Sequence, residues 1–201
     1  MDLKTVTSYD NSAAQVAALH TTLVPTRIYQ IINQFFVKDG YCADIGCGIG
    51  RDSAWLAEQK YNVIGMDASE GMLQQARDRY PYIPFIKMEL PLMEDVADCT
   101  FANVLCSAVI MHLAANQIAS ATANLTRIMT ENGVIVLSFR GTKNEDHREN
   151  GKLYTPISPE ELISYFTADG CILLHYDTEQ EKERNIVWNN LAFRKLPHPA
   201  V

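Results

Sequence analysis

The chain alternates between short apolar runs and longer segments in which apolar residues recur every three or four positions. Short apolar runs are typical of buried strands, whereas apolar residues that recur every three or four positions are typical of helices. Alternation of this kind predicts βαβ units and a mainly parallel sheet. The strands expected in that sheet are Tyr41–Ile45, Asn62–Met66, Ile83–Lys87, Thr100–Cys106 and Val134–Phe139.

The segments with helical spacing carry their own start and stop signals. Asp10–Ser12 can cap a first helix that runs to about Leu19. Pro25 suits the start of a second helix, and Gly40 is expected to end it. Further helices are expected from Arg51 to Lys60, from Ser69 to Tyr80, from Ile118 to a stop at Glu131–Gly133, and after Ser158, where Glu161 completes a capping box.

The last third of the chain departs from the parallel pattern. Two further strands are expected at Cys171–Tyr176 and Ile186–Arg194. The charged segment Asp177–Asn185 joins them directly and is too short for a helical crossover, so the two strands should pair antiparallel. We expect this charged segment to be a solvated turn.

Composition narrows the class of protein. The 201 residues, 47% hydrophobic and 20% charged, predict one globular domain over residues 1–201. The formal net charge of −7 argues against nucleic acid as a partner. No apolar run approaches the roughly 20 residues of a membrane span, and the first residues lack the pattern of a signal peptide, so no membrane partner is expected. Five cysteines without a C-x-x-C pair favour reduced thiols in a cytoplasmic protein, and no metal site is expected.

The segment with the most chemical information joins the first expected strand to the helix after it. It reads Asp44-Ile-Gly46-Cys47-Gly48-Ile-Gly50-Arg51. Glycines at such a turn let the backbone pass close to a ligand, toward which the N–H groups of the next helix point. Asp67 closes the second strand, where a carboxylate can accept hydrogen bonds from both hydroxyls of a ribose. The loop alone would also suit a plain tight turn, but together with Asp67 it predicts a nucleoside cofactor.

The spacing of the glycines distinguishes two such cofactors. A dinucleotide loop has the pattern G-x-G-x-x-G, whereas this loop has G-x-G-x-G followed by the bulky Arg51. Asp44, two residues before the first glycine, suits a cationic amino group better than a pyrophosphate. S-adenosylmethionine (SAM), an amino acid joined to adenosine, fits both features. An NAD(P)-dependent oxidoreductase stays an alternative because Asp67 would serve it equally, and so does a module that binds SAM without catalysis.

At these residues the chain resembles a known family. Asp44–Gly50 and Val63–Ser69 resemble the class I SAM-dependent methyltransferases, over about residues 41–140, and Gly50–Ala57 is similar to small stand-alone members such as the tellurite-resistance type. The resemblance implies a Rossmann-like α/β fold: a seven-stranded, mostly parallel sheet of order 3-2-1-4-5-7-6, with an antiparallel last strand and helices on both faces. It implies transfer of a methyl group to an oxygen or nitrogen nucleophile of a small molecule, with S-adenosylhomocysteine (SAH) as product.

The resemblance also implies where the cofactor lies. Asp44 and the loop glycines would follow its methionine part, and Asp67 would hold the ribose. Glu89, in the loop after the third strand, is the candidate partner of the adenine amino group, while a solvated loop charge is equally expected there. The complete expected set of cofactor-binding residues is Tyr9, Asp44, Gly46, Cys47, Gly48, Gly50, Arg51, Asp67, Ala68, Ser69, Met72, Met88, Glu89, Leu90, Cys106 and Ser107.

The segment after the fourth strand lies where the transferred methyl group is expected, since ligands of open α/β sheets bind at the carboxyl ends of strands. His112 is the candidate general base there, because its ordinary pKa is about 6.5. A base is needed only if the nucleophile arrives protonated. The alternative is that His112 holds a loop. Cys106 ends a buried strand and is expected to be a core thiol, not a nucleophile. Cys106-Ser-Ala-Val lacks the Pro-Pro-aromatic motif of enzymes that methylate amino groups of nucleic acids.

Two segments are candidate covers of the site. Residues 1–38 are expected to form an N-terminal helical lid, in which Tyr9, just before the first helix, closes over the cofactor or packs on the surface. Residues 140–157 are a possible substrate loop. Its Arg140, His147, Arg148 and Tyr154 could hold an anionic substrate, but the interleaved Glu145, Asp146 and Glu149 favour a loop that is simply solvated.

Overall fold

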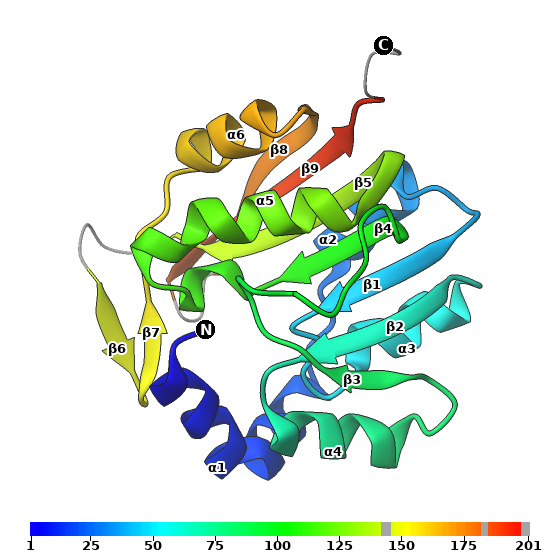
Figure 1. Ribbon diagram of the computed structural model, residues 1–201. Helices are drawn as coiled ribbons and strands as arrows, with labels where there is room; N and C mark the ends of the chain where they lie inside the picture. Colours follow the sequence, from blue (N-terminus) through cyan, green and yellow to red (C-terminus); the bar gives the residue numbers. More distant parts are fainter. Residues whose placement is uncertain (142–145, 182–184, 198–201) are drawn as a thin grey trace.

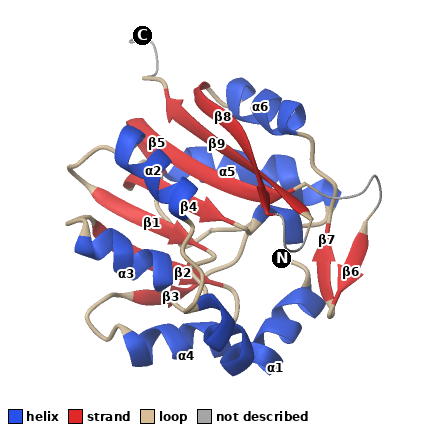
Figure 2. Cartoon of the chain, turned by 180° about the vertical axis from the view of Figure 1, so that it is seen from behind, coloured by secondary structure: helices blue, strands red, loops and turns tan. Residues whose placement is uncertain are grey.

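The core of the computed structural model, which describes residues 1–141, 146–181 and 185–197, is a seven-stranded sheet with helices on both faces (Figures 1 and 2). Its strands are β1 (Tyr41–Ile45), β2 (Asn62–Asp67), β3 (Phe85–Lys87), β4 (Phe101–Ser107), β5 (Met129–Arg140), β8 (Cys171–Glu181) and β9 (Ile186–Lys195). Their order is β3-β2-β1-β4-β5-β9-β8, parallel except that β9 runs antiparallel to both neighbours. The predicted α/β fold, with its reversed last strand, is confirmed.

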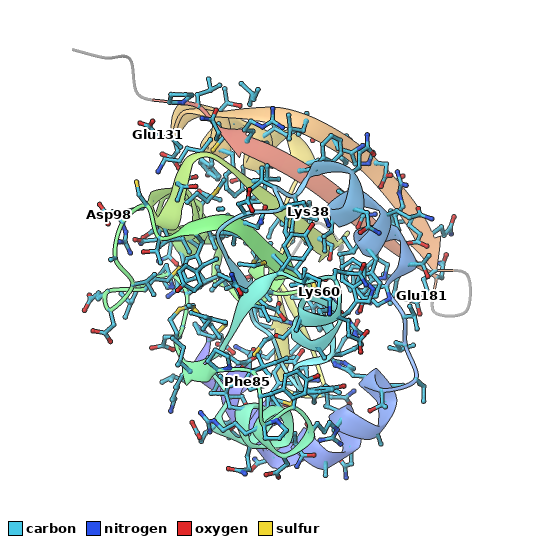
Figure 3. The ribbon with its side chains drawn as sticks, turned by 90° about the vertical axis from the view of Figure 1, so that its right-hand side faces the viewer. Lys38, Lys60, Phe85, Asp98, Glu131 and Glu181 are labelled. Atoms are coloured by element: carbon cyan, nitrogen blue, oxygen red, sulfur yellow. The ribbon has the colours of Figure 1, made fainter. Side chains whose placement is uncertain are left out.

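The described helices are α1 (Leu3–His20), α2 (Thr26–Phe35), α3 (Arg51–Glu58), α4 (Glu70–Arg79), α5 (Ile118–Ile128) and α6 (Pro159–Ala168), with short 3₁₀ turns η1 (Ile110–His112) and η2 (Ala115–Gln117). All but α1 pack on the faces of the sheet, and α1 packs against α4 in an apolar cluster of its own. Side chains of α5 and α6 share one apolar cluster, and those of α2, α3 and α4 share another on the opposite face. The central strand β4 is buried on both faces, as its apolar sequence predicts. Charged residues such as Asp98, Glu131 and Glu181 lie at the outline of the molecule (Figure 3).

The predicted caps of α4 and α6 are present, but the expected start of α1 is wrong. The Ser69 and Ser158 side chains accept hydrogen bonds from the amides of Met72 and Glu161. In contrast, α1 begins at Leu3, because the Asp2 carboxylate accepts the Thr5 amide at 2.8 Å and so caps the helix there. The Asp10 carboxylate, the expected cap, instead accepts from Ser69 Oγ and the Gly71 amide of α4. Tyr9 therefore lies inside α1 and not before it.

Two other predicted helix ends are also displaced. Helix α2 ends at Phe35, before Gly40, because the Asn103 side chain of β4 binds both the amide and the carbonyl of Val37 and holds the chain extended there. Helix α5 ends at Ile128, so Glu131–Gly133 lies within β5. Asn132 has a φ of 62° there, and the pairing of β4 with β5 shifts register at this point. The expected stop signal thus produces an irregularity in a strand.

The C-terminal hairpin β8–β9 pairs antiparallel as expected, but its charged segment is more than a solvated turn. β8 continues to Glu181, and the Asp177 carboxylate accepts hydrogen bonds from Arg27 of α2 and Asn190 of β9. Residues 182–184 of that segment and residues 142–145 of the expected substrate loop, which include Glu145, lie outside the described residues. Among the helices described, none is both long and apolar enough to span a membrane.

A second, two-stranded sheet occupies part of the expected substrate loop. It consists of β6 (His147–Glu149) and β7 (Lys152–Tyr154), paired antiparallel across Asn150 and Gly151. Both turn residues have positive φ, 51° and 82°, as the tight turn of a two-residue hairpin requires. Figures 1 and 2 show this hairpin beside α1, at the carboxyl ends of the sheet strands.

Candidate functional site

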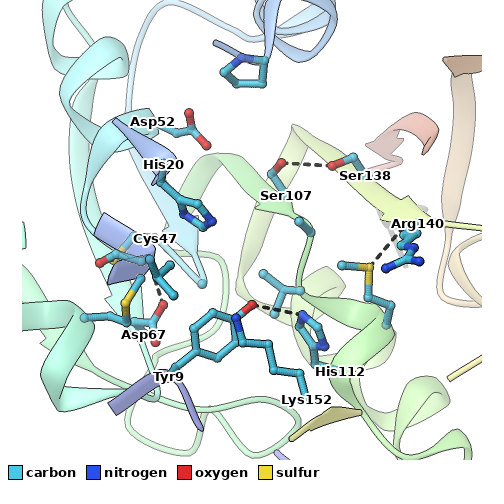
Figure 4. A pocket seen from close by; sticks show the side chains of 18 of the residues that line it. Tyr9, His20, Cys47, Asp52, Asp67, Ser107, His112, Ser138, Arg140 and Lys152 are labelled. Carbon is cyan, nitrogen blue, oxygen red and sulfur yellow. Dashed lines mark hydrogen bonds between the residues drawn. The ribbon is translucent and has the colours of Figure 1, made fainter. Parts of the chain in front are cut away.

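A cavity of about 790 Å³ opens at the carboxyl ends of β1, β2, β4 and β5, and α1 and the β6–β7 hairpin contribute to its walls (Figure 4). This volume lies within the range of about 300–1,000 Å³ typical of small-molecule sites. Most of the expected site residues line it: Tyr9, Gly46, Cys47, Gly48, Arg51, Asp67, Ala68, Ser69, Met72, Met88, Leu90, Ser107 and His112.

The glycine loop forms one wall of this cavity. The amides of Gly46 and Cys47 both donate to the Met66 carbonyl of β2, at 2.7 and 3.0 Å, and so fold the chain sharply after β1. A Cβ atom on Gly46 would lie 2.2 Å from Val109 Cγ2, and a Cβ on Gly48 would lie 3.3 Å from Met72 Cε. Close approach therefore excludes a side chain at Gly46, a positive φ favours glycine at both positions, and both residues line the cavity.

Asp67 lies at the end of β2 with its carboxylate beside this loop. One oxygen accepts the Gly48 amide and the other the Ser69 amide, both at 2.8 Å. Burial raises the pKa of this carboxyl group, while the bonds from Ser69 and Gly48 oppose the rise. A carboxylate has about four acceptor positions, so these amides leave Asp67 able to accept a hydrogen bond from a hydroxyl group of a ligand in the cavity.

Asp44 lies beneath the loop and not on the cavity wall. Its side chain is fully buried and accepts a 2.6 Å hydrogen bond from Ser53 Oγ. Burial, together with the nearby charge of Asp52, raises its pKa to about 7. The Asp52 carboxylate does line the cavity, but it is bound to the Arg51 guanidinium and to the Tyr29 hydroxyl.

Three other expected residues also lie off the wall. Gly50 forms the N-cap of α3, with a φ of 78°, and Cys106 is a fully buried core residue of β4. Glu89 is partly exposed, and its carboxylate is 3.9 Å from the N-terminal amino group. The structure therefore brings the loop, Asp67, Ser107 and His112 together and leaves Asp44, Gly50, Glu89 and Cys106 outside the cavity.

His112 is bound on both ring nitrogens. Its Nδ1 is 2.6 Å from the Leu153 carbonyl of β7 and donates to it, so Nε2 is left to accept the Tyr9 hydroxyl at 3.3 Å. Burial lowers the pKa of His112 to about 4. A neutral imidazole with both nitrogens engaged fits the alternative interpretation, in which His112 ties η1 to the hairpin, better than that of a general base near neutral pH.

The arginines of the expected substrate loop have carboxylate partners. Arg140 binds Glu149 through two hydrogen bonds of 2.7 and 2.9 Å, and its guanidinium lies over the Tyr154 ring. Arg148 binds Asp2 of α1 and does not line the cavity. These pairs leave little of either guanidinium for an anionic ligand.

Lys152 is one of several wall residues that the sequence did not single out. Its Nζ lies 3.8 Å from the centre of the Tyr9 ring, and Figure 4 shows it grouped with Tyr9 and His112. The signal that could have found it is Asn150-Gly151, a typical two-residue hairpin turn. Such a turn predicts strand alternation after it, with Lys152 and Tyr154 on one side and Leu153 on the other.

The fold and this cavity define the class of protein. A mostly parallel seven-stranded sheet with a reversed last strand, a glycine turn after β1 and an acidic residue closing β2 are the features of the class I SAM-dependent methyltransferase fold. Residues 42–133 match the family model of the methyltransferase domain. Over these residues the chain is similar to this family; the narrower resemblance to the tellurite-resistance type stays a prediction.

Comparison with known proteins agrees with this assignment. The crystal structure of the 1,6-didemethyltoxoflavin-N1-methyltransferase of Burkholderia thailandensis, with its ligand and SAH bound, superposes with a TM-score of 0.78 at 16% identity, over 96% of this chain and 87% of that one. An uncharacterized methyltransferase of Alkaliphilus oremlandii is 26% identical over 147 residues, 72% of this chain and 64% of that protein. A trans-aconitate 2-methyltransferase of an Acidovorax species is 32% identical over 103 residues, 49% of this chain and 38% of that protein. The chain thus spans less than two thirds of these curated relatives.

Proposed function

We propose that this protein transfers a methyl group from SAM to an oxygen or nitrogen nucleophile of a small molecule. The observation that carries the proposal is the cavity, which has the glycine loop and Asp67 on one side and Tyr9 and His112 on the other. The relative from Acidovorax and the structure from Burkholderia thailandensis are both named for small-molecule acceptors, which supports an acceptor of that size.

The residues on the cavity wall fit SAM. The acceptor capacity that remains on Asp67 suits a ribose hydroxyl. Met72 and Leu90, both buried, offer an apolar surface for the adenine, and the Gly46–Gly48 backbone leaves space for the methionine part. When bound, SAM supplies an electrophilic methyl group on a positively charged sulfur.

The contribution of the chain would be positioning and exclusion of water, which are large parts of catalysis for an already activated group. Three polar contacts attach α1 and its N-cap to the hairpin beside the cavity: Arg148 to Asp2, the Leu153 amide to Thr5 Oγ1, and Ser8 Oγ to the Asn150 carbonyl. On this basis we propose that α1 is the covering part of the expected lid, residues 1–38, since α2 packs on a face of the sheet, and that residues 140–157 contact the acceptor. All five cysteines are free, which supports a reducing compartment such as the cytoplasm.

Transfer of labelled methyl groups tests the proposal. The purified protein is incubated with SAM carrying a tritiated methyl group and with a deproteinised extract of small molecules. We expect label in a small-molecule product, and loss of that label with Asp67→Ala. Glu70→Ala, an exposed residue at the start of α4, is the control. Binding of SAM without any transfer would contradict catalysis and favour a module that only binds SAM.

A further inference from the structure

Lys152 places a positive charge on the cavity wall, and no carboxylate of the described residues forms an ion pair with it. Its side chain is half-buried against the Tyr9 ring. Among the described residues, no carboxylate oxygen lies within 4 Å of its Nζ, and its pKa is lowered by burial alone. The charge of a lysine that is partly dehydrated in this way is stabilised when an anion binds beside it.

The described carboxylates that line the cavity bind partners other than Lys152 or lie at the edge of the cavity. Glu149 is paired with Arg140, and Asp52 is paired with Arg51. Glu181 accepts a hydrogen bond from Trp188 Nε1 and lies at the outline of the molecule in Figure 3. Glu179, two residues before it on β8, is exposed. Asp67 is bound by the amides of the glycine loop and of α4, on the cofactor side.

The described groups next to Lys152 are not suited to take a proton near neutral pH, whereas His20 lines the cavity on the side of Cys47 and Asp52 (Figure 4). Nε2 of His112 already accepts the Tyr9 hydroxyl, and burial lowers the pKa of this histidine to about 4. Burial raises the pKa of both the Tyr9 hydroxyl and the Cys47 thiol. Asp44 has a pKa of about 7 but lies beneath the glycine loop, bound to Ser53. A nucleophile that arrives deprotonated suits this site best, and carboxylates, with an ordinary pKa near 4, do so.

We infer that the acceptor is a small carboxylic acid, which Lys152 holds beside Tyr9 and which is methylated on a carboxylate oxygen. This inference rests on the proposed function. One carboxylate oxygen forms the new bond to the methyl carbon, the carbon–sulfur bond breaks, and its electron pair stays on sulfur. The products are a methyl ester and SAH, and no proton is taken up or released.

Binding tests the inference without turnover. Benzoate, succinate and citrate, each beside its neutral amide, are titrated into the protein saturated with SAH. We expect at least one carboxylate to bind and its amide not to bind. Lys152→Gln should weaken that binding about tenfold or more, the loss of one charge-assisted hydrogen bond, whereas Lys152→Arg should retain most of it. Lys4→Gln, an exposed lysine of α1, is the control.

The reaction product gives a second, independent readout. A methyl ester releases tritiated methanol in mild base, whereas a methylated amine or alcohol does not. Label that resists base would overturn the inference, and so would failure of all three carboxylates to bind the SAH complex. A loss of SAH affinity in Lys152→Gln equal to the loss of carboxylate affinity would assign Lys152 to the cofactor instead. If the wild-type protein does not bind SAH at all, the proposed function itself fails.

Discussion

Neighbouring glycines in the loop after β1 are constrained in different ways. At Gly46 the backbone has a φ of 71°, and an added Cβ would lie 2.2 Å from Val109 Cγ2, an atom of a stiff β-branched side chain. At Gly48 the φ is 56°, and the nearest atom to an added Cβ is the flexible end of Met72 at 3.3 Å. The first position excludes a side chain on two grounds, the second mainly through its backbone conformation.

Alanine substitutions at these two positions should therefore differ. Gly46→Ala combines backbone strain with overpacking and should lower the free energy of unfolding by about 2–4 kcal/mol, against about 1–2 kcal/mol for Gly48→Ala. Urea denaturation of both variants measures the difference. Equal losses would show that the contact with Val109 is relieved by movement of the loop.

Ionisation of His112 makes the free energy of unfolding depend on pH. Its pKa is lowered to about 4 in the folded protein by burial, whereas an unfolded histidine has a pKa of about 6.5. As pH falls from about 6.5 toward 4, the unfolded chain binds a proton that the folded protein does not, so the free energy of unfolding decreases. His112→Asn should lose this part of the pH dependence. Denaturation curves at several pH values between these limits measure it, and an unchanged slope in the variant would contradict the assignment.

At the scale of elements, α1 is attached to the β6–β7 hairpin, and both line the cavity. Thr5 is buried, and its hydroxyl donates to Asp2 and accepts the Leu153 amide at 2.9 Å. Arg148, which binds Asp2, keeps the pKa of that carboxyl below its usual range. The Arg148–Asp2 pair is exposed, and exposed ion pairs stabilise proteins little. The Thr5 contact is therefore the more important of the two.

Thr5→Val keeps the shape of the side chain and removes both hydrogen bonds, which leaves the Leu153 amide without its acceptor. Hydrogen exchange should become faster in α1 and in β7, while β4 keeps its protection. Thr7→Val, an exposed position on the same helix, serves as the matched control. Equal exchange in the two variants would show that α1 is held by its other contacts.

The sequence predicted helices and strands well where the local pattern of residues sets their ends. It predicted them less well where contacts with distant residues set those ends. The apolar runs located the strands of the main sheet, and Ser69 and Ser158 marked two helix starts. The start of α1 and the end of α2 were misplaced because Asp10 is used by α4 and Asn103 binds the backbone of Val37. Such contacts join residues far apart in the chain, and hydrophobic periodicity carries no information about them.

At the scale of the whole molecule, the site too combines residues whose position local sequence predicts with residues that only the folded chain brings together. The glycine loop and Asp67 are close in sequence and follow a strand–turn–helix pattern, so their juxtaposition could be predicted. Lys152 is 143 positions from Tyr9 in the sequence, and only the folded chain brings the two together. Arg140, which the sequence offered as one residue that could hold an anion in a loop expected to be solvated, is paired in the structure with Glu149 of β6.

The central claim is that the cavity binds SAM, and titration calorimetry with SAM, SAH and NADH tests it most directly. We expect SAM and SAH to bind with dissociation constants on the order of micromolar and NADH not to bind. Asp67→Ala, if folded, should weaken SAM binding more than about tenfold, or about 1.4 kcal/mol. Binding of NADH alone, or of none of the three, would contradict the account.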